Sequence, residues 1–216
     1  MLKLVLIYYF QVYKIVLSFK EHLFEAQGHG LTMFDIDDTL FTTDNKVHVV
    51  KGGQTIRKLN AAEFNMYKRG PGEQYDYKEF ADASRFQREA KPIRPLLAKL
   101  KAMAKNIKQK AGSQIIMLTA RRNFDDKNIF LNTFRKFGIP IDDIRVERAG
   151  NINARSDVAK KMIVNDYLSK GIFNRVRLYD DHKQNLVSFL KLRDDYPNVD
   201  FEAYLVDKGK VRYFDA

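Results

Sequence analysis

Short apolar runs that end in polar residues recur along this chain, and segments with helical periodicity separate them. The runs at residues 31–34, 114–118, 176–179 and 201–206 have the length and composition of buried strands. Amphipathic segments lie between these runs, with apolar residues three and four positions apart. Strands that alternate with helices form βαβ units, in which successive strands are parallel. The sequence therefore predicts an α/β fold, in which a mainly parallel sheet is the middle layer of a three-layer core.

The helical segments have recognisable starting and ending residues. Pro95 is a residue favoured in the first turn of a helix, and Ser156 can cap the start of another. Glycine or proline follows each helical segment, as is usual at helix ends. The expected helices span residues 95–111, 126–137, 156–170 and 185–196.

The stretch from about residue 44 to residue 92 interrupts this alternation. It contains Gly52-Gly53 and Gly70-Pro71-Gly72, which are turn-forming sequences, together with many tyrosine and phenylalanine residues. We interpret it as an insertion into the α/β domain, and we expect it to form a small cap over the functional site.

Composition narrows the classes of protein that this chain can belong to. It has 216 residues, of which 45% are hydrophobic, enough for one globular domain with a core. It contains no cysteine, which excludes disulfides, thiolate zinc sites and a cysteine nucleophile. The net charge of +11 favours polyanionic partners such as nucleic acid or phosphorylated substrates, although a lysine-rich solvated surface explains it equally well.

Residues 1–28 precede the first predicted core strand and are treated as a separate, removable N-terminal segment, with the domain at 29–216. Their apolar stretch is interrupted by Lys3, Gln11 and Lys14, so it is too short for a bilayer span of about 20 residues. No small-x-small cleavage site follows, as a secretory signal requires, and a start of translation near Leu17 is a further alternative. We expect a cytoplasmic protein without a membrane partner.

Three of the predicted strands end in side chains that suit phosphate chemistry. Asp35 and Asp37 follow the first strand, Thr119 ends the second, and Asp180 and Asp181 follow the third. Ligands of parallel α/β sheets bind beyond the carboxyl ends of the strands, so these residues are expected to converge there. Four carboxylates at one place repel one another unless a cation is present, and Mg²⁺ is the natural candidate because it takes oxygen ligands.

Such a cluster can carry out phosphoryl transfer. One aspartate can attack phosphorus and form an aspartyl-phosphate, and a second can act as general acid and base. A lysine and a hydroxyl group near the phosphate oxygens stabilise the charge that is transferred. The residues themselves therefore favour a metal-dependent phosphatase.

These residues resemble the four motifs of the haloacid dehalogenase superfamily of phosphatases. The first motif, Asp-x-Asp-x-Thr after a buried strand, is matched by Asp35-Ile36-Asp37-Asp38-Thr39. The second is matched by Thr119 in Leu-Thr-Ala-Arg, the third by Lys160 or Lys161, and the fourth by Asp180-Asp181. The motifs occur in the family's order, and the resemblance covers about residues 30–181. It implies a Rossmann-like core with a cap.

The resemblance also implies a role for each residue. Asp35 is expected to be the nucleophile and a metal ligand, and Asp37 the acid/base, with its backbone carbonyl on the metal. Asp180 and Asp181 complete the Mg²⁺ shell, while Thr119 and the lysine hold the phosphate. We prefer Lys160 to Lys161, because Ala159 and Ile163 are then expected to pack inward.

The substrate is predicted less directly. Thr39 and Arg121 are expected to contact it, although Arg121 and Arg122 can equally be surface residues. Basic charge and the aromatic insertion favour nucleotides or nucleic-acid ends, as in the phosphatase domains of polynucleotide kinases, which this chain resembles. Sugar phosphates remain an alternative, and the sequence does not predict the oligomeric state.

A binding protein of the same fold, without catalysis, is the alternative from another functional class. Residues 18–26 resemble the short amphipathic leader on head proteins of large tailed phages, in which a prohead protease cleaves after Leu/Ile-x-Glu. Leu23-Phe24-Glu25 fits that pattern. On this reading the protein is phage-encoded and associated with the virion, whereas the simpler reading is an ordinary N-terminal helix.

Overall fold

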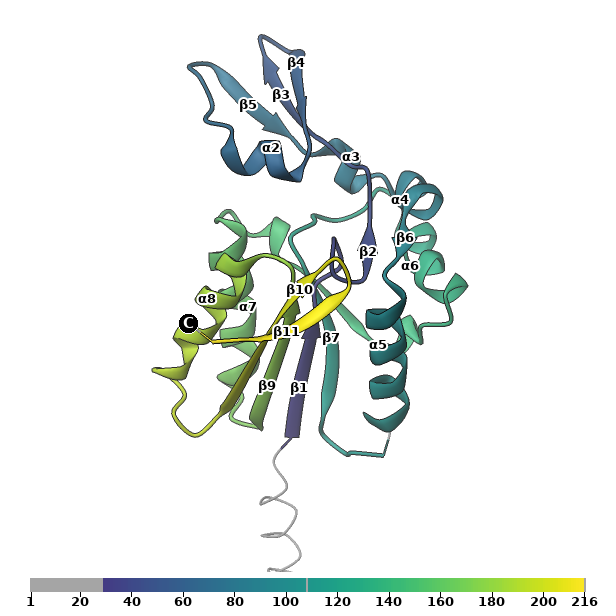
Figure 1. The fold of residues 1–216 in the computed structure, drawn as a ribbon, viewed down its shortest axis with the longest axis vertical. Coiled ribbons are helices and arrows are strands. Elements are labelled where there is room, and N and C mark those ends of the chain that lie inside the picture. The colour runs from purple at the N-terminus through teal and green to yellow at the C-terminus, as the bar shows by residue number, and fades with distance from the viewer. Residues whose placement is uncertain (1–28, 108, 216) are drawn as a thin grey trace, which may run out of the picture.

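A six-stranded sheet forms the centre of the larger part of the molecule (Figure 1). The computed structural model describes residues 29–107 and 109–215, so the predicted segment 1–28 and its cleavage motif lie outside the described residues. The strand order is β11-β10-β9-β1-β7-β8, and every neighbouring pair is parallel except β10 with β11. The strands are β1 (His29–Phe34), β7 (Gln114–Thr119), β8 (Arg145–Arg148), β9 (Phe173–Asp180), β10 (Asp200–Asp207) and β11 (Lys210–Phe214). The predicted α/β fold with a mainly parallel sheet is confirmed.

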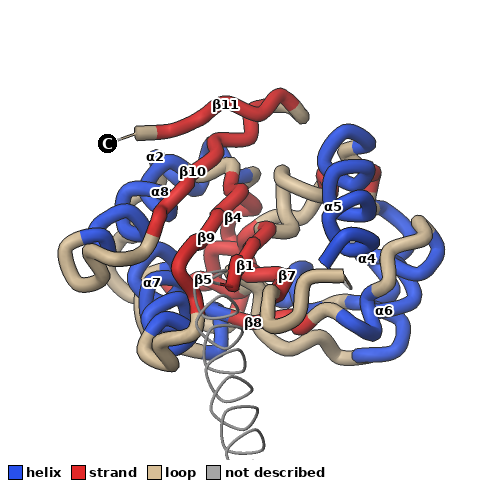
Figure 2. The backbone as a smooth tube through the Cα atoms, turned by 90° about the horizontal axis from the view of Figure 1, so that it is seen from below, coloured by secondary structure: helices blue, strands red, loops and turns tan. Residues whose placement is uncertain are grey.

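Helices cover both faces of this sheet (Figure 2). On one face α5 (Arg94–Ile107) and α6 (Lys127–Lys136) pack over a core that includes Phe34 of β1. On the other face α7 (Ser156–Leu168) and α8 (Lys183–Leu190) pack over a core that includes Leu31 and Met33. Because β1 is buried on both faces, it reads as a continuous apolar run rather than an alternating one.

Three elements differ from the sequence prediction. The helix expected at 185–196 is shorter, because α8 ends at Leu190 and a 3₁₀ turn, η3 (Lys191–Arg193), follows it. Ser156 is the first residue inside α7 rather than its cap, and the cap residue Arg155 makes no side-chain capping hydrogen bond. The edge strand β8 was not predicted, because its sequence Arg-Val-Glu-Arg lacks an apolar run. Two further 3₁₀ turns, η1 (Ile141–Asp143) and η2 (Ala149–Asn151), flank β8.

A second, smaller sheet lies apart from the first, and we call residues 47–76 the small lobe. It contains three antiparallel strands in the order β4-β3-β5 and one short helix. These elements are β3 (Val47–Lys51), β4 (Gln54–Leu59), α2 (Ala61–Met66) and β5 (Glu73–Asp76). The chain leaves the large sheet through β2 (Phe41–Thr42) and returns through α3 (Lys78–Ala81), α4 (Ala83–Glu89) and β6 (Lys91–Pro92). Strands β2 and β6 pair with each other, so the lobe is attached through a narrow two-stranded connection.

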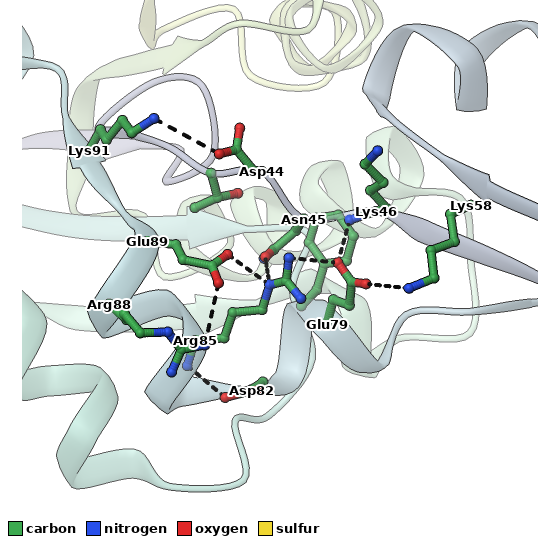
Figure 3. Close-up of polar contacts among 12 residues, drawn as sticks. Asp44, Asn45, Lys46, Lys58, Glu79, Asp82, Arg85, Arg88, Glu89 and Lys91 are labelled. Atoms are coloured by element: carbon green, nitrogen blue, oxygen red, sulfur yellow. Dashed lines mark hydrogen bonds and ion pairs between the residues drawn. The ribbon is translucent and has the colours of Figure 1, made fainter.

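A buried polar network holds this connection together (Figure 3). The carboxylate of Glu79, which is 8% exposed, accepts a hydrogen bond from the backbone N–H of Lys46 at 2.8 Å. It also lies 2.7 Å from His48 Nε2 and 3.3 Å from Arg85 Nη2. Arg85 Nε donates to Asn45 Oδ1 at 3.1 Å. We call these five residues the stem network, because they join the outgoing chain after β2 to the returning helices α3 and α4.

Within the described ranges, 29–107 and 109–215, no helix is both long enough and apolar enough to span a bilayer.

Candidate active site

A cavity of about 1110 Å³ lies between the carboxyl ends of the parallel strands and the small lobe. Its floor comes from the loop after β1, the first turns of α7 and the loop after β9, and its opposite wall includes Asn60 and Phe64 of the lobe region. Polar and charged residues dominate the floor, among them Asp35, Asp37, Asp38, Asp157, Lys160, Asp181, His182 and Asn185.

The backbone around β1 explains why Asp35 and Asp37 both reach this cavity. The N–H of Asp35 donates to the carbonyl of Tyr179 at 2.9 Å, which extends the pairing of β1 with β9 by one residue. The chain then turns sharply, since the carbonyl of Ile36 accepts hydrogen bonds from the N–H groups of both Leu40 and Phe41. Asp38 occupies the turn with φ of 52°, a left-handed conformation that aspartate tolerates better than most residues.

Lys160 joins two of the predicted carboxylates. Its ammonium nitrogen donates to Asp35 Oδ1 and to Asp180 Oδ2, each at 2.7 Å, although 125 residues separate Lys160 from Asp35. The Lys160 side chain is 3% exposed, and its position in the second turn of α7 points it at the ends of β1 and β9. Lys161 does not line the cavity, so Lys160 is the lysine that the fold brings to the carboxylates.

Asp35, Asp180 and Asp181 form a cluster that fits a metal ion. Each offers one carboxylate oxygen, and these oxygens lie within 4.8 Å of one another. A set of carboxylate oxygens suits a hard divalent cation rather than a thiophilic metal. Asn185 holds Asp180 in place through its side-chain amide, at 2.9 and 3.0 Å from the two carboxylate oxygens. Asp37, whose backbone carbonyl is the atom predicted to bind the metal, contributes no carboxylate oxygen to this cluster.

Burial and mutual repulsion perturb the charges of this cluster. Burial raises the pKa of Asp35 to about 7; Lys160 opposes that shift, and the carboxylates of Asp180 and Asp37 add to it. Burial, followed by the charges of Asp35 and Asp180, raises the pKa of Asp181 to about 9. Burial disfavours the charge of Lys160, but Asp180 and Asp35 outweigh it and raise the pKa of that lysine. The raised pKa values show that burial and mutual repulsion disfavour the fully charged carboxylates beside a single ammonium group, and a bound cation would favour their charged forms.

Asp37 has a different partner. Arg121 holds it with two hydrogen bonds, Nε to Oδ2 at 2.7 Å and Nη2 to Oδ1 at 2.6 Å. The remaining Arg121 nitrogen, Nη1, donates to the carbonyl of Phe80 at 2.8 Å. The guanidinium also lies 5.2, 4.8 and 5.4 Å from the ring centres of Phe80, Phe86 and Phe124. Arg121 is thus enclosed and does not line the cavity, so the structure places it against Asp37 rather than at the expected substrate position.

The two predicted threonines are both fully buried. Thr119 ends β7, and its hydroxyl oxygen accepts a hydrogen bond from the backbone N–H of Arg121 at 3.2 Å. The hydroxyl of Thr39 is one of the few buried side-chain groups without a hydrogen-bond partner in the described part of the chain. Neither threonine lines the cavity, although Ala120, next to Thr119, does.

The sequence interpretation did not include Asp157 and Asn185. Asp157 lies three residues before Lys160, so both face the same side of α7, and helical spacing was the available signal. Its carboxylate accepts hydrogen bonds from Arg155 Nη2 and from Ser188 Oγ, each at 2.8 Å, which ties α7 to α8. His182, interpreted as a solvated loop residue, is exposed and also lines the cavity.

Comparison of the chain with protein-family models, with curated proteins and with solved structures finds no match. The function is therefore inferred from the residues and their geometry. These bring together a buried lysine, three clustered carboxylates and a separately held fourth carboxylate around one cavity.

Proposed function

We propose that this protein is a Mg²⁺-dependent phosphomonoester hydrolase of the haloacid dehalogenase superfamily, in which the small lobe is the cap. The observation that carries the proposal is the bridge from Lys160 to Asp35 and Asp180 on the cavity floor, beside Asp181. A buried ammonium group next to clustered carboxylates is an arrangement that binds a phosphate dianion and a divalent cation together.

In this proposal Asp35 is the nucleophile. One of its carboxylate oxygens attacks phosphorus, the bond from phosphorus to the ester oxygen breaks, and an aspartyl-phosphate forms. Water then attacks this intermediate, and inorganic phosphate leaves with the aspartate restored. Lys160 contacts Asp35 directly, so its charge lies where the negative charge of the transferred group passes.

Asp37 is the general acid and base. It gives a proton to the departing ester oxygen and takes one from the attacking water, which balances the two steps. Its side chain is 27% exposed and lines the cavity, so a substrate oxygen can reach it. Arg121 does not touch the substrate; it is a positioning residue that fixes the direction of the Asp37 carboxylate.

Asp35, Asp180 and Asp181 are the residues that would hold Mg²⁺. When bound, the cation supplies positive charge that neutralises the carboxylates and polarises the phosphate. Asn185 fixes the orientation of Asp180, as groups that support metal ligands commonly do.

The test is hydrolysis of p-nitrophenyl phosphate by the full chain, with Mg²⁺ and with a chelator. We expect Asp35→Asn to lower turnover by at least about 10³-fold, because the nucleophile is lost. Asp194→Asn makes the same chemical change at an exposed position and should leave the rate unaltered. Activity that persists both in Asp35→Asn and after chelation would show that the proposed mechanism is wrong.

A further inference from the structure

In the small lobe, α2 lies on the side that faces the large sheet (Figure 1). Phe64 of this helix belongs to a group of aromatic rings that also includes Tyr67, Tyr75 and, just after the lobe, Tyr77. Phe64 of α2 contacts Tyr75 and Tyr77 with ring centres 4.9 and 6.1 Å apart, and Tyr67 lies 6.4 Å from Tyr75. Phe64 lines the cavity above the carboxylates, whereas Tyr77 is 40% exposed. The rings therefore extend from the cavity wall to the surface of the molecule.

Cationic side chains accompany these rings. The guanidinium of Arg69 lies 4.9 Å from the ring centre of Tyr75, and that of Arg57 lies 5.7 Å from Tyr67. Both arginines occupy exposed positions of the small lobe. Lys46 and Arg155 add positive charge to the cavity lining itself.

We infer that this aromatic and basic face, formed by Phe64, Tyr77, Arg57 and Arg69, binds single-stranded nucleic acid and leads its phosphorylated end to Asp35. The inference rests on the proposed function for the fate of that end, but the binding surface does not depend on it. Unpaired bases stack on aromatic rings whatever their sequence, and guanidinium groups neutralise the phosphates between them. A duplex keeps its bases stacked on one another and cannot use the rings in this way.

The extent of the aromatic and basic face favours a nucleic-acid strand over a smaller ligand. A sugar phosphate would be recognised by hydrogen-bonding groups close to the phosphate, whereas Tyr77, Arg57 and Arg69 do not line the cavity. A mononucleotide would fill the cavity and contact Phe64, but it would not need Arg57 and Arg69. Only a chain of nucleotides places further phosphates and bases along the whole face.

Binding is tested with a fluorescent, unphosphorylated oligothymidylate of about ten nucleotides, within the site sizes of single-strand-binding surfaces. The full chain is titrated at several salt concentrations, and fluorescence anisotropy gives Kd. We expect Tyr77→Ala to raise Kd at least about five-fold through lost stacking, while Tyr77→Phe, which keeps the ring, stays near wild type. The pair Arg57→Ala with Arg69→Ala should raise Kd and lower the slope of log Kd against log salt by about two.

The matched control is the pair Lys101→Ala with Lys105→Ala, which removes two charges from the exposed side of α5. It should leave the salt slope close to that of the wild type. Thermal unfolding followed by circular dichroism confirms that each variant is folded before its Kd is interpreted.

Three results would overturn the inference: equal effects of the two double variants, a duplex of the same sequence bound as tightly as the single strand, or no binding of the oligonucleotide. Wild-type protein that hydrolyses p-nitrophenyl phosphate without binding the oligonucleotide would remove this inference and leave the proposed function standing. Protein that binds the oligonucleotide but does not hydrolyse p-nitrophenyl phosphate would remove the proposed function and leave the binding surface standing.

Discussion

At the floor of the cavity the side chains of Lys160 and Asp180 are 3% and 0% exposed, whereas all residues of β4 except Leu59 are exposed in the small lobe. The floor is assembled from residues far apart in the sequence, which the parallel strands β1 and β9 bring together. The lobe is a local structure of short antiparallel strands, attached through β2, β6 and the stem network.

This difference separates the two tasks, chemistry and substrate binding, that the proposed function assigns to the cavity. Buried charges on the floor depend on one another, because a charge that loses its partner in the interior is strongly destabilising. Exposed side chains of the lobe can change with little effect on folding, since surface substitutions usually alter stability by less than about 0.5 kcal/mol. Changes on the floor should therefore affect chemistry and stability together, and changes in the lobe should affect substrate binding alone.

The largest effect is expected for Lys160→Ala. It leaves the carboxylates of Asp35 and Asp180 buried without their common partner, which should lower the free energy of unfolding by about 3–5 kcal/mol in the absence of Mg²⁺. Lys161→Ala, at the next position, should change it by less than about 0.5 kcal/mol. Urea unfolding followed by circular dichroism measures both, and p-nitrophenyl phosphate hydrolysis should fall far more in Lys160→Ala. Similar losses in the two variants would contradict the assignment of the lysine.

Arg121→Ala is expected to have the next largest effect. The Asp37 carboxylate loses a bidentate partner, but it is partly exposed, so the free energy of unfolding should fall by about 2 kcal/mol. Turnover should fall by about 10²-fold, because in the proposed mechanism Arg121 directs Asp37, and a general acid that points in the wrong direction loses most of its contribution. Arg121→Lys keeps the positive charge but cannot make the bidentate contact with Asp37. It should therefore restore the free energy of unfolding more fully than it restores turnover.

A double-mutant cycle identifies the mechanism of the Arg121 effect. If Arg121 acts through Asp37, the rate losses of Arg121→Ala and Asp37→Asn will not add in the double variant. Additive losses would show that Arg121 acts on the substrate independently.

The large domain could be predicted from sequence to a greater extent than the lobe. Strands such as β1 and β7 are buried on both faces and therefore appear as apolar runs, whereas β8 and β4 consist mainly of polar residues that are half-buried in β8 and exposed in β4. An edge strand that buries little surface leaves no hydrophobic pattern to read. The turn sequences between residues 44 and 92 show where the alternation of strands and helices stops, but they did not predict the three strands β3, β4 and β5.

The site shows the same division. Asp35, Asp180 and Asp181 could be predicted to lie together, because each lies at the carboxyl end of a strand of a parallel sheet or directly after it. The directions of the Asp37, Arg121 and Thr119 side chains could not be predicted from the sequence. They depend on the turn after β1 and on ring contacts made by α3, α4 and the β7–α6 loop. The pattern of apolar and polar residues locates the end of a strand, but it does not predict which neighbouring residues a side chain will contact.

Glu79→Gln tests whether the stem network holds the lobe. The amide keeps the shape of the carboxylate but weakens its contacts with Lys46, His48 and Arg85, so stability should fall by about 1–2 kcal/mol. Hydrogen exchange should accelerate in the small lobe and stay slow in β1, which belongs to the other region. Asp44→Asn is the control in the same segment, because its contact with Lys91 joins two exposed side chains 3.9 Å apart. Equal acceleration in β1 and the lobe would show that the two regions unfold as one unit.

The smallest effect is expected for Asp157, which lies at the rim of the floor and has the solvent-exposed Arg155 as a partner. The hydrogen bond from Arg155 is the main cause that lowers the pKa of Asp157 to about 2; burial opposes it and Ser188 assists. A carboxylate whose pKa is lower in the folded than in the unfolded chain stabilises the fold above its ordinary pKa of about 4, and this contribution disappears as pH falls towards 2. We expect Asp157→Asn to lower the free energy of unfolding by on the order of 1 kcal/mol near neutral pH, since the partner is exposed. The difference between wild type and variant should then shrink between about pH 4 and pH 2, as urea unfolding across this range would measure. A difference that stays constant with pH would mean that Asp157 acts through packing at the α7–α8 contact and that its charge contributes nothing to the fold.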